Sequence, residues 1–194
     1  MMRLLSMSVG FALMLMALPS RTGAEQHRGG VHTPGGDIKP SQHAEVRQRV
    51  GRPLRGEGLG TLVTVVYNRP VARGRNLFGK LVPWGRIWCP CADAATTLRV
   101  STDVTINGQV LPAGTYSVWS EPQSDEWTII FSRAANVSHS QYPIGEDALR
   151  IKATPRSGEH METLAFYFPV VDGRKAELVL HWGTVVVPLT IEVP

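Results

Sequence analysis

The sequence contains few of the features that identify an enzyme class. It has no complete phosphate-binding loop, no H-E-x-x-H zinc motif and no glycine-rich dinucleotide fingerprint. It also has no G-x-S-x-G elbow to expose a serine, although Ser, His and Asp are all present. Catalytic groups can lie far apart in a sequence, so an unrecognised hydrolase stays open as a third hypothesis. The absences nevertheless favour a protein that is not an enzyme.

Excess charge is also scarce. The net charge of +4 includes Arg3 and Arg21, and without these two residues 18 basic side chains face 16 acidic ones, which leaves +2. Nucleic-acid binding usually requires a concentrated basic face. We therefore expect no nucleic-acid partner.

The one long hydrophobic run is too short to span a membrane. Residues 4–18 form an uncharged run of 15 residues, whereas a transmembrane helix needs about 20. Arg3 precedes the run, and small residues follow at Thr22 and Ala24, as in an export signal that is cleaved. No cysteine lies near this point to carry a lipid. We expect a signal peptide over residues 1–24 and an exported protein, periplasmic or extracellular, without a membrane span.

Residues 25–60 lack a regular hydrophobic period and are rich in Gly, Arg, Gln, His and Pro. Such a composition buries too little apolar surface to order the chain, which predicts a flexible leader. Glu45 and Arg49 have the i,i+4 spacing of a helical pair, so residues 39–49 could form a short helix. The spacing of the leader histidines fits no compact metal site: His27, His32 and His43.

From residue 61 onward the sequence indicates many short strands and almost no helix. Runs rich in β-branched and aromatic residues are separated by Gly, Pro, Asn and Asp, which predicts an all-β domain over residues 61–194. The expected fold is an antiparallel β-sandwich, Ig-like or jelly-roll-like. The predicted strands are 61–67, 86–89, 96–101, 104–106, 115–120, 127–132, 148–154, 162–168, 175–182 and 184–193.

Three local patterns refine this prediction. Asn107 and Gly108 tolerate positive φ, as a two-residue hairpin turn requires. Gly183 separates the last two predicted strands, so a hairpin or a bent pair with a bulge is expected there. Long loops are expected over residues 71–85 and 133–146, and residues 75–81 could form one helical turn.

Several blocks of this domain resemble the bacterial domain-of-unknown-function family 2911. They are Y-N-R-P-V-A-R-G-R-N-L-F-G-K-L-V-P-W-G-R-I-W, A-D-A-A-T-T, T-D-V-T-I-N-G with L-P-A-G-T-Y-S, E-W-T-I-I-F and T-V-V-V-P-L-T-I-E-V. The resemblance covers residues 67–193 and implies an exported β-sandwich. It implies no catalytic residues. The chain departs from the Arg-Thr-Gly-like stretch expected after the second tryptophan, because it has Cys89-Pro90-Cys91 there.

Cys89 and Cys91 are the only cysteines, and three interpretations compete for them. They could form a disulfide in a small, strained ring, which would be easily reduced. Paired thiolates could bind copper or zinc, with a third ligand brought in by folding from His139, His160 or His181. They could also be ordinary buried side chains. Apart from that metal, we expect no cofactor.

The loop before the cysteines combines basic and aromatic side chains. Arginine binds carboxylate and phosphate groups, and tryptophan faces bind sugar rings or guanidinium groups. The alternative is that Arg73 or Arg75 pairs with Asp93 or Asp103 to hold the loop, while the tryptophans fill the core. The candidate binding residues are Arg73, Arg75, Trp84, Arg86, Trp88 and Asp93, with Arg69 and Lys80 in the same basic loop.

Asp93 could bind Ca²⁺ or a substrate hydroxyl together with Thr96 and Thr97, or it could cap a turn. His181 lies in an alternating strand beside Trp182, which favours a packed histidine over a catalytic base.

The favoured hypothesis is a non-enzymatic binding module that uses residues 71–88. Its partner would be a small molecule, a glycan or a protein. The alternative is a thiol-dependent redox or copper-binding protein that acts through Cys89 and Cys91.

Overall fold

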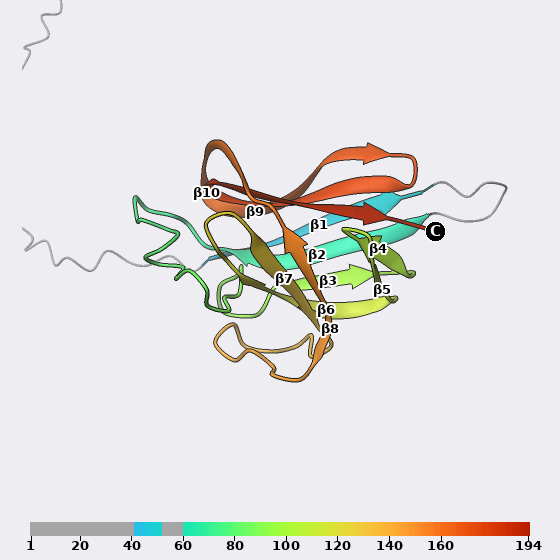
Figure 1. Ribbon diagram of the computed structural model, residues 1–194, viewed down its shortest axis with the longest axis horizontal. Coiled ribbons are helices and arrows are strands. Elements are labelled where there is room, and N and C mark those ends of the chain that lie inside the picture. Colours follow the sequence, from blue (N-terminus) through green and yellow to red (C-terminus); the bar gives the residue numbers. More distant parts are fainter. Residues whose placement is uncertain (1–40, 52–59) are drawn as a thin grey trace, which may run out of the picture. The chain divides into compact units, whose positions relative to one another are not determined.

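The computed structural model describes residues 41–51 and 60–194 (Figure 1). The predicted signal peptide and residues 25–40 of the predicted leader lie outside the described residues. Within the described ranges no residue is helical, so no helix long and apolar enough to cross a bilayer occurs there.

Two antiparallel sheets pack face to face, which confirms the predicted all-β sandwich. The larger sheet has six strands in the order β1-β2-β3-β6-β7-β8. Their bounds are β1 Gln42–Val50, β2 Thr61–Arg69, β3 Thr97–Val100, β6 Gly114–Glu121, β7 Trp127–Ser132 and β8 Asp147–Ala153.

The smaller sheet has four strands in the order β5-β4-β10-β9. Their bounds are β4 Val104–Ile106, β5 Gln109–Leu111, β9 Arg156–Asp172 and β10 Lys175–Glu192. In Figure 1, β9 and β10 lie at the top and form a long hairpin above β1 and β2.

Strand β1 corrects the predicted boundary of the domain. Residues 42–50 were expected in the leader, with a short helix over 39–49, but β1 pairs along its whole length with β2, from Gln42 opposite Arg69 to Val50 opposite Thr61. Side chains four apart share a face in a strand as well as in a helix, so the Glu45–Arg49 spacing did not distinguish the two. Glu45 instead forms an ion pair with Arg47, two residues along the same face.

The turn chemistry confirms two local predictions. Asn107 and Gly108 have φ of 47° and 80° and join β4 to β5 as a two-residue hairpin. At Gly183, with φ of 59°, the register between β9 and β10 shifts. Strand β10 therefore continues through a bulge, which confirms the bent pair, and the predicted hairpin at Gly183 is wrong.

Two other local predictions are wrong. Residues 86–89 form no strand, because only Trp88 makes a bridge, to Ser120. Residues 75–81 form turns and not a helical turn. The glycines and prolines of this segment explain both differences, since they interrupt regular pairing.

The main hydrophobic core lies between the two sheets. The inward-facing side chains include fully buried Val63 and Val65 from β2, Leu164 from β9 and Ile191 from β10. The outer face of the six-stranded sheet carries a second, smaller cluster of Cys89, Cys91, Ala95, Trp119 and Ile130. Segments 89–95 and 133–146 therefore cover the middle of this sheet from outside, because Val137 and Tyr142 pack against the cluster.

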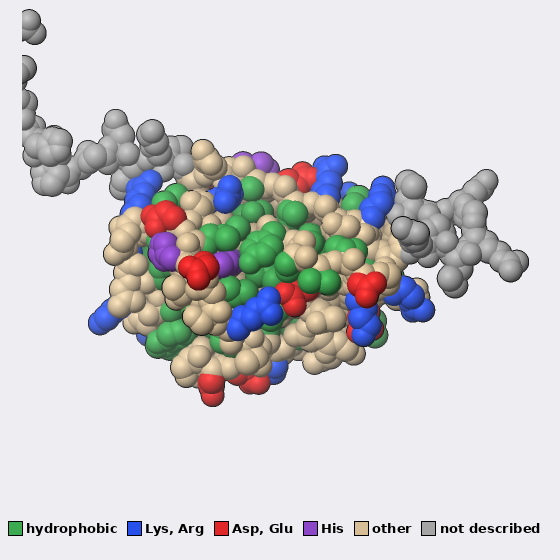
Figure 2. Space-filling model, turned by 90° about the horizontal axis from the view of Figure 1, so that it is seen from above, with side chains coloured by type: hydrophobic (Ala, Val, Ile, Leu, Met, Phe, Trp, Pro, Cys, Tyr) green, Lys and Arg blue, Asp and Glu red, His purple; other side chains and the backbone are tan. Residues whose placement is uncertain are grey.

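Figure 2 shows the molecule from above, on the side of β9 and β10. Hydrophobic side chains gather in the middle of this face, and charged side chains lie around them. Strand β9 contributes two exposed apolar residues near its end, Val170 and Val171.

Candidate functional site

The loop of residues 71–88 is attached to the middle of β9. The Ala72 amide donates to the Glu162 carbonyl at 2.7 Å, and Val71 forms a bridge with Thr163. The Glu162 carboxylate adds a second attachment, because its Oε1 accepts a hydrogen bond from the Arg73 amide at 2.6 Å. Arg73 has a positive φ of 53°, and this bond holds the loop at that unusual backbone position.

Glu162 also accepts a hydrogen bond from His160, whose Nε2 lies 3.0 Å from its Oε2. The hydrogen bonds from His160 and from the Arg73 amide lower the pKa of the Glu162 carboxyl from its ordinary value of 4.5. The carboxylate is therefore the favoured form, and it is already engaged by two donors.

Arg75 holds its own loop rather than a carboxylate. Its Nε donates to the Ala72 carbonyl at 2.9 Å, and its Nη2 donates to the Val71 carbonyl at 2.6 Å. Arg75 forms no ion pair with Asp93 or Asp103 within the described part of the chain.

Trp84 is the most exposed tryptophan of the described chain, at 45%. One face stacks on Phe78, with ring centroids 6.0 Å apart and an interplanar angle of 25°. Gly79 makes this position possible, because a Cβ there would lie 2.6 Å from the indole Nε1 of Trp84. The indole is therefore held in place before any ligand arrives, with much of its surface open to solvent.

Phe78 connects the Trp84 indole to the core. Its ring packs edge-on against Trp88, Trp127 and Trp182 at centroid distances of 5.3–6.4 Å. Trp88 is half-buried and stacks on Trp182, with ring centroids 6.0 Å apart. The two predicted tryptophans thus differ: Trp84 is presented at the surface, and Trp88 packs inside.

A pocket of about 340 Å³ lies beside Trp84. Its lining brings together Arg75, Phe78 and Trp84 from the loop with His160 from β9 and Gly183 from β10. Arg86 is exposed two residues after Trp84 in the chain, and Arg73 is exposed at the loop's attachment to β9. The sequence did not predict His160, Phe78 and Gly79 as parts of a binding pocket, because their places there depend on folding, which brings β9 beside the loop and Trp84 against Phe78 and Gly79.

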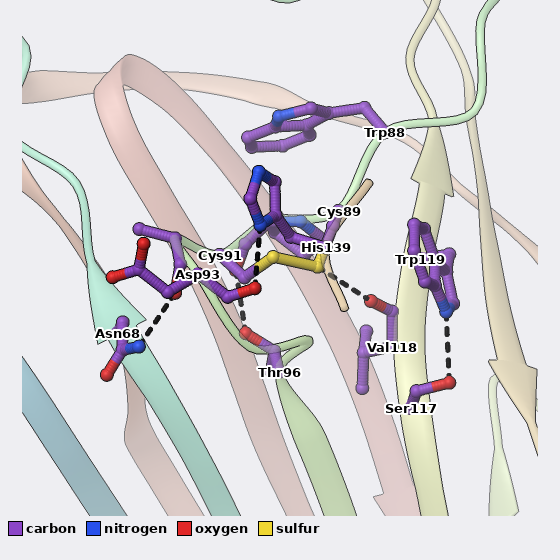
Figure 3. Close-up of a disulfide and its surroundings, with 12 residues drawn as sticks. Asn68, Trp88, Cys89, Cys91, Asp93, Thr96, Ser117, Val118, Trp119 and His139 are labelled. Atoms are coloured by element: carbon purple, nitrogen blue, oxygen red, sulfur yellow. Dashed lines mark hydrogen bonds between the residues drawn. A yellow bond between two sulfur atoms is a disulfide. The ribbon is translucent and has the colours of Figure 1, made fainter. Parts of the chain in front are cut away.

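Cys89 and Cys91 form a disulfide (Figure 3). Both residues are buried, at 4% and 9% exposure, within the cluster that contains Trp119. Their segment is held by the Thr96 hydroxyl, which donates to the Pro90 carbonyl at 2.8 Å. Within the described part of the chain, no group of three or more His, Cys, Asp or Glu side chains is placed to hold a metal ion.

The remaining histidines have other partners. His181 is buried, its Nε2 lies 3.0 Å from the Glu159 carbonyl and its Nδ1 lies 3.1 Å from the Tyr167 hydroxyl. Because a carbonyl can only accept, Nε2 is the donor and Nδ1 accepts from the tyrosine. Both ring nitrogens are engaged, as expected for a packed histidine.

Asp93 lies apart from the Trp84 pocket. It has a φ of 67°, and its carbonyl accepts hydrogen bonds from the His139 amide at 3.1 Å and from the His139 Nδ1 at 2.6 Å. In Figure 3 its carboxylate points away from the disulfide, on the side of Asn68. Of the predicted binding residues, only Arg75 and Trp84 line the Trp84 pocket. Trp88 packs against Trp182, and Asp93 lines a different pocket.

Comparison with known proteins identifies a family but no characterised relative. No curated protein and no solved structure matches the chain. One family model, described as "Protein of unknown function (DUF2911)", matches residues 44–191. This range begins inside β1 and ends inside β10, so it covers nearly all of the sandwich and the whole loop that carries Trp84. The chain therefore belongs to the DUF2911 family.

Proposed function

We propose that this protein is an exported, non-enzymatic binding module that holds an acidic sugar on the 71–88 loop. The observation that carries the proposal is the fixed, 45% exposed indole of Trp84 at the edge of a 340 Å³ pocket. An aromatic face can stack on a sugar ring, and a rigid face loses little conformational entropy when the sugar binds. The pocket volume is within the range of about 300–1,000 Å³ that is usual for small-ligand sites.

The charge of the loop favours an acidic ligand over a neutral one. Residues 69–92 contain five basic side chains and no Asp or Glu. Arginine and lysine beside an apolar platform bind carboxylate, sulfate or phosphate groups carried by a ring. Export would place this surface where extracellular or periplasmic glycans occur.

The exposed apolar residues of the loop support an interaction surface. Leu81, Trp84 and Ile87 are 42%, 45% and 37% exposed. Tryptophan and arginine are the residue types that are enriched among the contacts that dominate binding energy, so Trp84 is the expected centre of this surface.

Calorimetric titration of the full mature chain tests the proposal. We expect a glucuronic-acid oligosaccharide to bind and its neutral glucose counterpart to bind more weakly. Trp84→Ala should weaken the binding of the acidic oligosaccharide by roughly 2 kcal/mol, as expected for a central tryptophan contact. Val110→Ala is the matched control, because Val110 is an exposed apolar residue on β5, at 62%, and does not line the pocket.

Arginine variants separate the charge from the aromatic contribution. Arg86→Gln should reduce the preference for the acidic oligosaccharide, whereas Arg99→Gln removes the same charge from an exposed position on β3 and should not. Equal affinity for acidic and neutral oligosaccharides in the unmodified protein would contradict the acidic ligand class.

A thiol-dependent function is the second candidate, and the disulfide is the observation that favours testing it. A redox couple needs a sulfur that an attacking thiolate can reach. The burial of Cys89 and Cys91 favours a structural role instead. Intact mass with and without reductant, followed by metal analysis, distinguishes the two: a disulfide that survives mild reductant and carries no copper or zinc supports the structural role.

A further inference from the structure

A second, larger pocket lies on the outer face of the six-stranded sheet. This groove has a volume of about 510 Å³ and runs between β2 and the segments around residues 94 and 137. Val66, Ala95 and Val137 give it apolar walls, and Asn68, Asp93 and Asn136 give it polar groups. None of the residues that line it also lines the Trp84 pocket.

The wall that carries Asp93 is fixed by four hydrogen bonds. Asn68 Nδ2 donates to the Ala92 carbonyl at 2.7 Å, and His139 makes its two bonds to the Asp93 carbonyl. The Ala95 amide donates to the Val137 carbonyl at 3.0 Å, which joins the two segments that form the groove. The groove is therefore built from mutually bonded backbone and does not need a ligand to bring its sides together.

The groove carries an acidic side chain, whereas the loop that carries Trp84 is basic. Asp93 is its only lining carboxylate, and no Lys or Arg lines it. Its other ionisable lining residues are Tyr67, which is buried, and His43, which is exposed and whose Nδ1 lies 3.3 Å from the Asn68 Oδ1. Within residues 41–51 and 60–194, no ion pair involves Asp93.

We propose that this groove binds a small primary amine with a short apolar body. The ammonium group would contact the Asp93 carboxylate and the Asn136 side chain, and the apolar part would lie against Val66, Ala95 and Val137. A carboxylate supplies charge-assisted hydrogen bonds to an ammonium, and the apolar walls supply the burial that a fully polar site lacks. This site is independent of the acidic-sugar site, since it differs in position and in the sign of the charge it prefers.

A ¹H–¹⁵N NMR titration of the full mature chain near pH 7 tests this proposal with hexylamine, hexanoate and hexanol as probes. The three probes share an apolar chain and differ in head-group charge. We expect hexylamine to cause saturable shifts of the Ala94, Ala95 and Val137 amides, and hexanoate and hexanol to bind roughly tenfold more weakly or not at all, because neither carries an ammonium group that can donate a charge-assisted hydrogen bond to Asp93.

The decisive variant is Asp93→Asn, which should weaken hexylamine binding by roughly tenfold or more. Asn is the appropriate replacement because it tolerates the positive φ at this position, so the loop is retained. Asp125→Asn removes the same charge from the exposed turn between β6 and β7 and should leave binding unchanged. Equal binding of hexylamine and hexanol, or unaltered hexylamine binding by Asp93→Asn, would overturn the proposal.

Discussion

At the scale of single residues, glycines decide how the candidate site is formed. Gly79 has a φ of 84° and leaves the space that the Trp84 indole occupies. Asp93 and Arg73 adopt positive φ without being glycine, and each is held there by a specific hydrogen bond. The Trp84 indole, the attachment of the loop to β9 and the groove thus each depend on one residue with positive φ: Gly79, Arg73 and Asp93, respectively.

Gly79→Ala tests the first of these positions. The new Cβ would lie 2.6 Å from Trp84 Nε1, so the indole must move and acidic-sugar binding should weaken. Gly74→Ala is a matched control, because Gly74 also has positive φ, 66°, but nothing lies within 4 Å of its added Cβ. Both variants should lower the free energy of unfolding by about 1 kcal/mol from backbone strain, measured by urea denaturation. An equal loss of binding in both would contradict the role of the Trp84 contact.

The Glu162 carboxylate on β9 accepts a hydrogen bond from the 71–88 loop, so its protonation state affects how the loop is attached. Its pKa is lowered in the folded protein, so its contribution to stability is present above the ordinary value of 4.5 and is lost as the pH falls through the lowered pKa. We expect the Arg73 amide to lose protection against hydrogen exchange below pH 4.5, before the core amides do.

The control for this pH dependence is Glu162→Gln. Glutamine keeps a carbonyl that can accept the Arg73 hydrogen bond but does not titrate in this range. Arg73 protection in this variant should be independent of pH over the same interval. A wild-type Arg73 amide whose protection depends on pH no more than it does in Glu162→Gln would contradict the attachment.

At the scale of elements, the bulge in β10 joins the two halves of the longest strand. Gly183 sits where the register with β9 shifts, and an added Cβ would meet Leu77 Cδ1 at 2.9 Å. The bulge therefore lets β10 bend while Leu77 of the 71–88 loop packs against it. This explains why residue 183 is a glycine in a strand that is otherwise rich in β-branched residues.

Gly183→Ala should consequently destabilise the fold and displace the loop. Strain and overpacking together should lower the free energy of unfolding by about 2–3 kcal/mol. Gly173, in the turn between β9 and β10, also has positive φ, but no atom lies within 4 Å of its added Cβ. Gly173→Ala should therefore cause only backbone strain and no overpacking. Urea unfolding of both variants gives the difference, and equal values would show that the Leu77 contact contributes little.

The segment between the cysteines is a second element that can be tested. The disulfide closes a ring of three residues, for which the chain-entropy relation gives about 1–2 kcal/mol of stabilisation. Cys89→Ser with Cys91→Ser should lower the free energy of unfolding by that amount and loosen the cover over Trp119, as read from tryptophan fluorescence. A loss of acidic-sugar binding without any loss of stability would instead assign a functional role to the sulfurs.

At the scale of the whole molecule, the sandwich could be predicted because its turns carry local chemical patterns. Asn107-Gly108 specifies its hairpin through the φ values that these residues tolerate. Strand β1 was missed although Ala44, Val46 and Val50 alternate with charged residues, because the surrounding composition suggested a leader. An edge strand and a flexible leader are both exposed to water, so both carry many charged residues and their compositions are similar.

The candidate site was less predictable than the fold. Trp84 and Trp88 are the same residue type with similar neighbours in sequence. Only packing against Phe78, Gly79 and Trp182 distinguishes the exposed indole from the half-buried one. The groove beside Asp93 joins β2 to segments that lie about 25 and 70 residues away. No local sequence pattern predicts that these distant segments pack together.

Truncation tests the revised domain boundary. A chain of residues 41–194 keeps β1, whereas residues 61–194 correspond to the domain expected from sequence. Removing β1 exposes the long edge of β2 and removes the fully buried Val50. We expect the longer chain to unfold cooperatively in urea and the shorter chain to be less stable by several kcal/mol or to aggregate. Equal stability of the two chains would place β1 outside the folding unit.

The central claim is that a rigid, exposed Trp84 binds an acidic sugar. The most direct test is the dissociation constant of a glucuronic-acid oligosaccharide for the mature protein and for Trp84→Ala, measured by calorimetry under identical conditions. We expect measurable binding that weakens by roughly thirtyfold in the variant, which corresponds to about 2 kcal/mol. Binding that is unchanged in a folded Trp84→Ala variant would contradict it.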